Sequence, residues 1–416
     1  METIGLIGGG VMGAGLARHF LAQGLLVSLV EADQNLAQKA RQRLDKTLSK
    51  DVARGRLEPD QAARRLANLS AGQDLSRLQA ADLVIEAVPE DLNLKKRVLA
   101  AAENKLRPQA ILATNTSALS VSALAAALSR PERFLGTHFF NPAQVMPLVE
   151  VVPGLETGPE VIHQTLAFLS QAGKRPIRVK ERPGFLVNRI LGAYMNEALW
   201  LLEETAGIAE LEAAAKEMGL PLGPAVLGDM AGWDVIHAAN KTLAQSYGQR
   251  FEVPPLLAQL DSLARHGLKT GRGLFDHSVQ PARPTQDLAP LSRNLDQDQL
   301  QEVKTRLILS IIAESVRCLD EDLVSAPDLD QALIMGAGLK QGPLAWADQI
   351  GLDRVLDHLE RFQGRFGPRF WPVPLLKIYV SSGHTGRSAG WGLAGKYGRQ
   401  DAPRWRAGLT TREKSK

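Results

Sequence analysis

Short apolar runs alternate with segments of helical period through the first part of the chain. Runs of strand length cover residues 3–8, 25–31, 81–88 and 110–114, and the first three are each followed by a segment of helical pattern. Alternation of this kind is typical of a parallel sheet covered by helices. We therefore predict an α/β domain over residues 1–182.

Two later apolar runs carry a histidine and a glutamate, His138 and Glu150, twelve positions apart. Pro142 and Pro147 lie between them and favour a turn or loop there. If the two strands lie side by side, the imidazole can take a proton while the carboxylate fixes its tautomer and stabilises the cation. The alternative is a core histidine and an unrelated surface glutamate.

The pattern becomes almost wholly helical after Arg182-Pro183-Gly184, with a proline-rich linker at 281–290. The predicted helices are Phe185–Ala206, Ile208–Met218, Met230–Gln245 and Pro255–Arg265. Beyond the linker the sequence repeats in register, since Arg189–Glu204 aligns with Arg306–Glu321. We predict two tandem all-α domains, at 183–280 and 291–395.

A glycine-rich turn joins the first predicted strand to the first helix. Gly8, Gly10 and Gly13 fit the fingerprint of a dinucleotide-binding turn, with Val11 and Met12 opening the helix. Gly8 permits the tight turn, Gly10 lets a pyrophosphate approach the backbone, and Gly13 allows close packing of helix and strand. The first domain is therefore predicted to be of the Rossmann type.

An acidic residue ends the second predicted strand, eighteen positions after Gly13. Glu31 can accept hydrogen bonds from a ribose 2′-hydroxyl and repels a 2′-phosphate, which favours NAD over NADP. Asp33 is an alternative for this role. Ligands in such folds lie beyond the carboxyl ends of the strands, where Glu90, the segment Asn115-Thr116-Ser117 and His138 also fall.

Composition adds little to this interpretation. The net charge is +4, and the stretch from Lys396 to Lys416, which has seven basic and two acidic residues, is predicted to be a solvated basic tail. No nucleic-acid-binding motif accompanies it. The single cysteine, Cys318, excludes an intrachain disulfide and fits a reducing compartment. With no signal-type segment or membrane-length apolar run, we expect a cytoplasmic protein that binds neither nucleic acid nor membrane.

Several spaced motifs together resemble the L-3-hydroxyacyl-CoA dehydrogenase family over residues 3–276. They are Gly8–Gly15, Asn115-Thr116-Ser117, His138–Pro142, Leu148–Val151 and Pro183–Arg189. The duplicated helical domain is similar to the dehydrogenase part of bacterial multifunctional fatty-acid-oxidation subunits. In shorter relatives, the resemblance implies, a second subunit covers the face that the second copy would cover here. A monomeric pseudo-dimer is therefore expected, with a homodimer as the alternative.

The resemblance implies a role for each matching residue. His138 would be the catalytic base and Glu150 its orienting carboxylate, and Ser117 and Asn188 would hydrogen-bond the reacting oxygens of the substrate. Glu90, Lys95 and Asn115 would join Glu31 and the glycine turn in holding NAD. Thr47 and Arg54 match positions that contact coenzyme A.

The reaction implied is the reversible NAD-dependent oxidation of an L-3-hydroxyacyl-CoA to a 3-oxoacyl-CoA, as in fatty-acid β-oxidation. Two alternatives stay open: a dehydrogenase of a small hydroxy acid without CoA, of the gulonate type, and a catalytically silent NAD-binding structural protein. The basic segment around Thr47 and Arg54 favours a CoA ester. The complete set of His138, Glu150, Ser117 and Asn188 argues against a silent protein.

Overall fold

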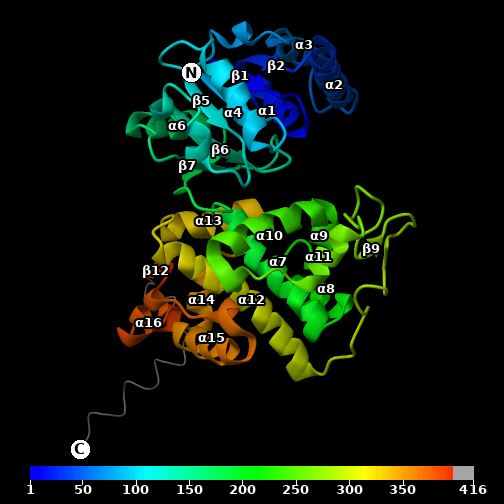
Figure 1. Ribbon diagram of the computed structural model, residues 1–416, viewed down its shortest axis with the longest axis vertical. Coiled ribbons are helices and arrows are strands. Elements are labelled where there is room, and N and C mark those ends of the chain that lie inside the picture. Colours follow the sequence, from blue (N-terminus) through cyan, green and yellow to red (C-terminus); the bar gives the residue numbers. More distant parts are fainter. Residues whose placement is uncertain (397–416) are drawn as a thin grey trace, which may run out of the picture. The chain divides into compact units, whose positions relative to one another are not determined.

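The chain divides into two compact units. In a computed structural model, which describes residues 1–396, the first unit runs from Met1 to Phe185 and the second begins at Leu186 (Figure 1). Except for its first residue, Lys396, the predicted basic tail lies outside the described residues.

An eight-stranded sheet forms the centre of the first unit, in the order β3-β2-β1-β4-β5-β6-β7-β8. The strands are β1 (Thr3–Ile7), β2 (Leu26–Val30), β3 (Leu69–Gly72), β4 (Leu83–Glu86), β5 (Ile111–Thr114), β6 (Phe134–Phe139), β7 (Leu148–Pro153) and β8 (Arg175–Arg178). The first six strands run parallel, whereas β7 is antiparallel to β6 and β8 is parallel to β7. The predicted Rossmann-type sheet is confirmed.

Helices connect these strands and cover the sheet. They are α1 (Val11–Ala22), α2 (Gln34–Ala53), α3 (Pro59–Ala67), α4 (Leu92–Glu103), α5 (Val121–Ala125) and α6 (Pro159–Gln171). The helical pattern from Gln34 to Leu66 is interrupted after α2, where Gly55 takes a left-handed φ of 65°. Strand β3 was not predicted, because Leu69-Ser70-Ala71-Gly72 is too short and too polar to read as a buried strand.

The core of the first unit explains why its strands read as continuous apolar runs. Ile4 and Leu6 of β1 are fully buried, and Phe20 of α1 is buried in the same cluster as Val149 and Val151 of β7. A parallel strand covered on both faces has no side exposed to water, so its sequence does not alternate between apolar and polar residues.

The second unit contains the same helical arrangement twice. The first copy has α7 (Val187–Glu204), α8 (Ile208–Glu217), α9 (Pro224–Ala231), α10 (Trp233–Tyr247) and α11 (Pro255–Ser262). The second has α12 (Gln297–Asp320), α13 (Ala326–Ala337), α14 (Pro343–Ile350), α15 (Leu352–Phe366) and α16 (Pro374–Ser381). The duplicated helical domain is therefore confirmed.

Two details of this helical prediction were wrong. The segment predicted as one helix from Met230 begins inside α9, and Gly232, with a φ of 97°, separates α9 from α10. Each copy also ends in a short antiparallel pair rather than in helix alone. The pairs are β9 (Phe275–Asp276) with β10 (Arg283–Pro284), and β11 (Trp391–Gly392) with β12 (Gly395–Lys396).

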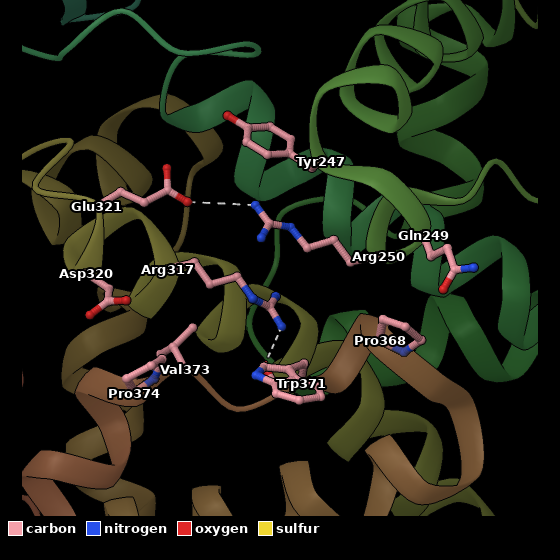
Figure 2. Close-up of a pocket in the computed structure, with 10 residues that line it drawn as sticks. All are labelled: Tyr247, Gln249, Arg250, Arg317, Asp320, Glu321, Pro368, Trp371, Val373 and Pro374. Carbon is pink, nitrogen blue, oxygen red and sulfur yellow. Dashed lines mark hydrogen bonds and ion pairs between the residues drawn. The ribbon is translucent and has the colours of Figure 1, made fainter.

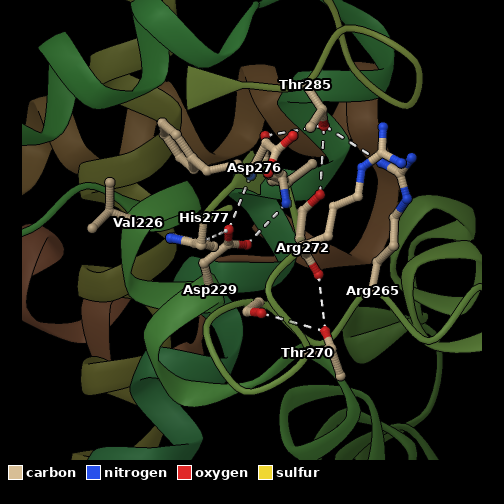
Figure 3. A network of polar contacts seen from close by, with 12 residues as sticks. Val226, Asp229, Arg265, Thr270, Arg272, Asp276, His277 and Thr285 are labelled. Atoms are coloured by element: carbon tan, nitrogen blue, oxygen red, sulfur yellow. Dashed lines mark hydrogen bonds and ion pairs between the residues drawn. The ribbon is translucent and has the colours of Figure 1, made fainter. Parts of the chain in front are cut away.

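A buried aspartate attaches each of these short strand pairs to its copy. Asp229 of α9 accepts hydrogen bonds from the backbone N–H groups of Leu274 and Phe275, each at 2.9 Å, and lies 2.7 Å from His277 Nε2 (Figure 3). In the second copy, Asp348 accepts equivalent bonds from the N–H groups of residues 393 and 394. A carboxylate that receives several N–H donors satisfies its own buried charge, so it can hold a loop in place.

The two copies meet along their long helices, α7 and α12, through reciprocal ion pairs. On one side, Arg189 of α7 donates from Nε to Glu314 and from its two terminal nitrogens to Glu321, each at 2.7 Å. Arg189 and Glu314 are almost completely shielded from solvent. Buried charges of this kind are tolerated only when they are paired and hydrogen-bonded.

The other side repeats these contacts with the roles exchanged. Arg306, which lies 117 positions after Arg189, donates to Glu197 at 2.5 Å and to Glu204 at 2.7 Å. In a twofold interface residue i contacts residue j, and j contacts i on the partner. The two copies therefore pair as the halves of a twofold dimer do, within a single chain.

Candidate active site

His138 and Glu150 lie opposite each other in the antiparallel pair β6–β7. His138 Nδ1 is 2.6 Å from Glu150 Oε2, and the glutamate side chain is completely buried. A carboxylate only accepts hydrogen bonds, so Nδ1 carries the proton and Nε2 is the ring atom with a lone pair. The structure therefore brings together the two residues that the sequence places twelve positions apart.

Aromatic side chains position the His138 ring. Its centroid lies 4.6 Å from that of Phe140 and 5.7 Å from that of Phe185, with both rings tilted against it. His138 has only 5% of its surface exposed, and it lies near the carboxyl end of β6. A neutral imidazole held in one tautomer and one orientation has the arrangement required of a general base.

The glycine turn between β1 and α1 has the geometry that its sequence predicts. Gly8 takes a φ of 98°, and a side chain on Gly13 would lie 1.8 Å from the Gly8 carbonyl oxygen. No protein atom lies within 4 Å of the position that a β-carbon on Gly10 would take. Val11 and Met12 form the first turn of α1, and Val11 is 77% exposed. The turn can accept a phosphate group at the N-terminus of α1.

The structure distinguishes the two acidic candidates near β2. Glu31 lies against the glycine turn, where its Oε1 accepts a hydrogen bond of 2.6 Å from the Gly9 N–H. Asp33 instead caps α2 by accepting a hydrogen bond from the Leu36 N–H. Asp33 thus serves as the N-cap of its own helix, whereas Glu31 lies beside the glycine turn.

Lys95 is completely buried and bonded to protein groups. Its ammonium donates to Glu86 at 2.8 Å and lies 3.3 Å from the Glu90 carboxylate. Glu86, at the end of β4, also accepts hydrogen bonds from Thr114 and the Val88 N–H. Sequence reasoning missed Glu86, although a charged residue inside the apolar run 81–88 was a signal. Lys95 therefore orients Glu90, and any contact with a cofactor would be made through that neighbour.

Glu90 organises the loop that follows β5. Its Oε1 accepts hydrogen bonds from the Thr116 hydroxyl at 2.5 Å and from the Ser117 N–H at 2.9 Å. Burial alone would raise the pKa of Glu90, but the Lys95 ammonium and these hydrogen bonds lower it below its usual value. Asn115 accepts a hydrogen bond of 2.9 Å from the Phe139 N–H, one residue beyond His138. The loop is thus fixed to the strand that carries the histidine.

The remaining candidate residues lie on helices. Thr47 and Arg54 are seven positions apart, at and just beyond the C-terminal part of α2, and the Thr47 hydroxyl donates to the Arg43 carbonyl oxygen at 2.7 Å. Arg54 is exposed. Asn188 is the second residue of α7 in the second unit and is partly buried.

Within residues 1–396, no group of histidine, cysteine, aspartate and glutamate side chains is arranged to bind a metal ion. In the same part of the chain, no helix is both long and apolar enough to cross a membrane.

Solved structures with a similar fold include dehydrogenases. A 3-hydroxybutyryl-CoA dehydrogenase from Escherichia coli K12 has a TM-score of 0.84 and 30% identity, and the match covers 92% of this chain and 98% of that one. A (S)-3-hydroxybutyryl-CoA dehydrogenase from Ralstonia eutropha has a TM-score of 0.65 and 35% identity, over 67% of this chain and 100% of that one.

Curated relatives of similar sequence are longer proteins. The fatty acid oxidation complex subunit alpha of Shewanella sp. (strain ANA-3) is 35% identical over 390 residues, which are 90% of this chain and 55% of that protein. The chain thus spans about half the length of the curated relatives that it matches.

Two family domains together account for most of the chain. Residues 3–182 match the NAD binding domain of 3-hydroxyacyl-CoA dehydrogenase, and residues 184–277 and 303–395 match its C-terminal domain. The first domain contains the glycine turn and the His138–Glu150 pair, and the second domain is the one that occurs twice. The chain belongs to the 3-hydroxyacyl-CoA dehydrogenase family.

Proposed function

We propose that the protein catalyses the reversible NAD-dependent oxidation of an L-3-hydroxyacyl-CoA to the 3-oxoacyl-CoA, as a step of fatty-acid β-oxidation or related acyl-CoA metabolism. The observation that carries this proposal is the buried contact of 2.6 Å between His138 Nδ1 and Glu150 in the family's NAD binding domain. The E. coli and R. eutropha dehydrogenases support it, since both are named for 3-hydroxybutyryl-CoA.

The contact between His138 and Glu150 determines which nitrogen of the imidazole accepts the substrate proton. Because Nδ1 donates to Glu150, Nε2 of His138 accepts the proton of the C3 hydroxyl as the C–H bond at C3 breaks. NAD supplies the acceptor for the hydride that leaves C3. The buried carboxylate then stabilises the imidazolium, and in the reverse direction the same nitrogen returns the proton.

The other roles follow the same assignment. Ser117 and Asn188 hydrogen-bond the reacting oxygen atoms, and Glu31 binds the adenosine ribose beside the glycine turn. Glu90 and Asn115, with Lys95 behind them, shape the loop on the cofactor side. Thr47 and Arg54 present a hydroxyl and a guanidinium to the phosphates of CoA.

A dehydrogenase of a small hydroxy acid is the second candidate. The exposed basic residues of α2, together with Arg54 at its end, favour the CoA ester, because a small hydroxy acid carries no phosphate groups to pair with them. Steady-state kinetics with acetoacetyl-CoA and free acetoacetate, each with NADH, separate the two. A higher kcat/KM for the free acid would reject the CoA assignment.

Substitution of the pair tests the mechanism. His138→Gln is expected to reduce turnover of acetoacetyl-CoA by about 100- to 10,000-fold while NADH affinity stays unchanged. Glu150→Gln should also reduce kcat, with little effect on the KM for NADH. His163→Gln, on the exposed surface of α6, is the matched control and should behave as wild type. A His138→Gln variant that keeps a tenth of wild-type activity would exclude His138 as the base.

We further propose that the chain works as a monomer in the cytoplasm. The reciprocal contacts between α7 and α12 support the first part, because the second copy already occupies the face that a second subunit would cover. A tethered copy has a high effective concentration and excludes a free competitor. Analytical ultracentrifugation tests this against the chain mass of 45.1 kDa.

A further inference from the structure

A cavity of about 480 Å³ lies between the two copies of the second unit, and none of the residues assigned above lines it (Figure 2). It is lined by Tyr247, Gln249, Arg250, Arg317, Asp320, Glu321, Pro368, Trp371, Val373 and Pro374. Trp371 is 57% exposed, so the cavity is open to solvent at its rim. The lining combines flat apolar surfaces with two guanidinium groups.

Positive charge is in excess on the cavity side of the helix pair. Among the described residues, Arg189, Arg250 and Arg317 surround the two buried or half-buried carboxylates of Glu314 and Glu321. Arg250 lies 3.5 Å from Glu314 and 3.8 Å from Glu321, and its Nε and Nη2 make no hydrogen bond to any described residue. The three guanidinium groups thus outnumber these two carboxylates, and the third acid of the cavity lining, Asp320, is exposed to solvent.

The opposite side of the pseudo-twofold has no such excess. There Arg306 and Arg369 pair with Glu197 and Glu204. Arg317 has no counterpart of its own type, because the residue 117 positions earlier is Trp200. Both sides carry an acidic residue three positions further along, Asp320 after Arg317 and Glu203 after Trp200. The difference in charge between the two sides therefore comes from the exchange of arginine and tryptophan.

The two equivalent glutamates respond to this difference in opposite ways. Burial raises the pKa of Glu197 above its usual value despite Arg306 and Arg369. Burial also acts on Glu314, but the guanidinium groups of Arg317, Arg189 and Arg250 lower its pKa below the usual value. The electrostatic potential on the cavity side is thus more positive than on its symmetric counterpart.

On the opposite side of the pseudo-twofold, an aromatic ring lies beside the equivalent arginine. The guanidinium of Arg369 lies 4.7 Å from the centre of the Trp200 ring. Arg250 is the equivalent of Arg369, since it is the last residue but one of the 3₁₀ turn η3 (Gly248–Phe251), as Arg369 is in η4 (Gly367–Phe370). Arginine binds flat aromatic rings by cation–π and stacking contacts.

We propose that the cavity binds a small aromatic carboxylate. Its ring stacks on the guanidinium of Arg250 inside the cavity, and it packs against Trp371 and the proline side chains. Its carboxylate compensates the charge that Arg317 adds. Binding bridges the two copies and so stabilises their association by mass action.

Calorimetric titration of the full chain with benzoate tests the proposal. Benzoate should bind at one site with a Kd on the order of 1 mM. Benzamide, which has the ring without the charge, and cyclohexanecarboxylate, which has the charge without the aromatic ring, should each bind at least about tenfold more weakly. Absence of saturable benzoate binding, or equal binding of either analogue, overturns the proposal.

Two substitutions test where benzoate binds, and each introduces the residue found at the equivalent position of the first helical copy. Arg317→Trp introduces the residue found at the equivalent position of α7 and should weaken benzoate binding at least about tenfold. Trp371→Glu introduces the equivalent residue Glu252 at an exposed position, so it serves as the test if Arg317→Trp fails to fold. Ile378→Gln, exposed on α16 and outside the cavity lining, is the control and should bind as wild type. Benzoate binding that survives both cavity substitutions lies elsewhere and overturns the assignment.

Discussion

Replacing Arg306 by methionine should destabilise the helical unit strongly, because Arg306 is completely buried at the centre of the helix pair α7–α12. It donates to Glu197 at 2.5 Å and to Glu204 at 2.7 Å, and its guanidinium lies 4.0 Å from the Phe366 ring. Methionine keeps an unbranched apolar stem but removes the charge. Glu197, which has only 2% of its side chain exposed, would then retain Arg369 at 3.3 Å.

The loss in the free energy of unfolding follows from the Glu197 carboxylate that stays buried without Arg306. Removing one partner of a buried ion pair costs about 3–5 kcal/mol. Because Arg369 still compensates part of the Glu197 charge, we expect the free energy of unfolding to fall by about 3 kcal/mol, at the lower end of that range. For a unit of this size, the loss corresponds to a decrease in Tm of about 6–12 °C.

Urea unfolding followed by tryptophan fluorescence measures the loss, with an unchanged slope indicating an unchanged unfolded state. The double variant Arg306→Met/Glu197→Met should be more stable than Arg306→Met alone, because it removes the uncompensated carboxylate. Arg365→Met is the matched control: its ion pair with Glu302 is half exposed, and such pairs contribute less than about 1 kcal/mol. A single-variant cost below that of the control, or additive effects in the double variant, would refute the reasoning.

Three further predictions concern the cofactor, acid stability and the second copy. Glu31→Ala should raise the KM for NAD and narrow its advantage over NADP, measured by steady-state kinetics; equal use of both cofactors by the wild type would contradict the assignment. Burial and the Lys174 ammonium lower the pKa of His19 to about 4. As the pH falls, the unfolded chain therefore binds a proton at His19 at a higher pH than the folded chain does. The free energy of unfolding keeps its full value above about pH 6.5 and falls by up to about 3 kcal/mol as the pH drops to about 4. His19→Gln should remove this part of the pH dependence in urea titrations, and an unchanged profile would exclude His19 as its source. A chain truncated at Pro284 should dimerise or aggregate through the face exposed on α7, as measured by light scattering, and a soluble, active monomer would oppose the pseudo-dimer.

Local pattern was enough to predict most strands of the sheet, the glycine turn and the duplication of the helical domain. It left the contact between His138 and Glu150 as one of two alternatives, and the family resemblance favoured the contact that the structure shows. Gly232 was missed as a helix boundary, since one glycine in an amphipathic segment does not show whether its φ is positive. Glu86 was missed because its partners, Lys95 and Thr114, come from separate elements and nothing local indicates the pairing.

The reciprocal ion pairs were also beyond the sequence. Alignment of the repeats places Glu197 on Glu314, which shows that the two residues are equivalent. It does not show that each of them faces the arginine of the other copy rather than that of its own. This distinction depends on how α7 and α12 pack, and packing is a property of the folded chain.

The duplication removes a constraint that applies to every symmetric dimer. In two identical subunits related by a twofold axis, each mutation appears on both sides of the axis, so a favourable change on one side must also be tolerated on the other. In this chain a mutation in α12 leaves α7 as it was. Arginine at 317 can therefore face a different neighbourhood from tryptophan at 200, a combination that no homodimer of one gene product could encode.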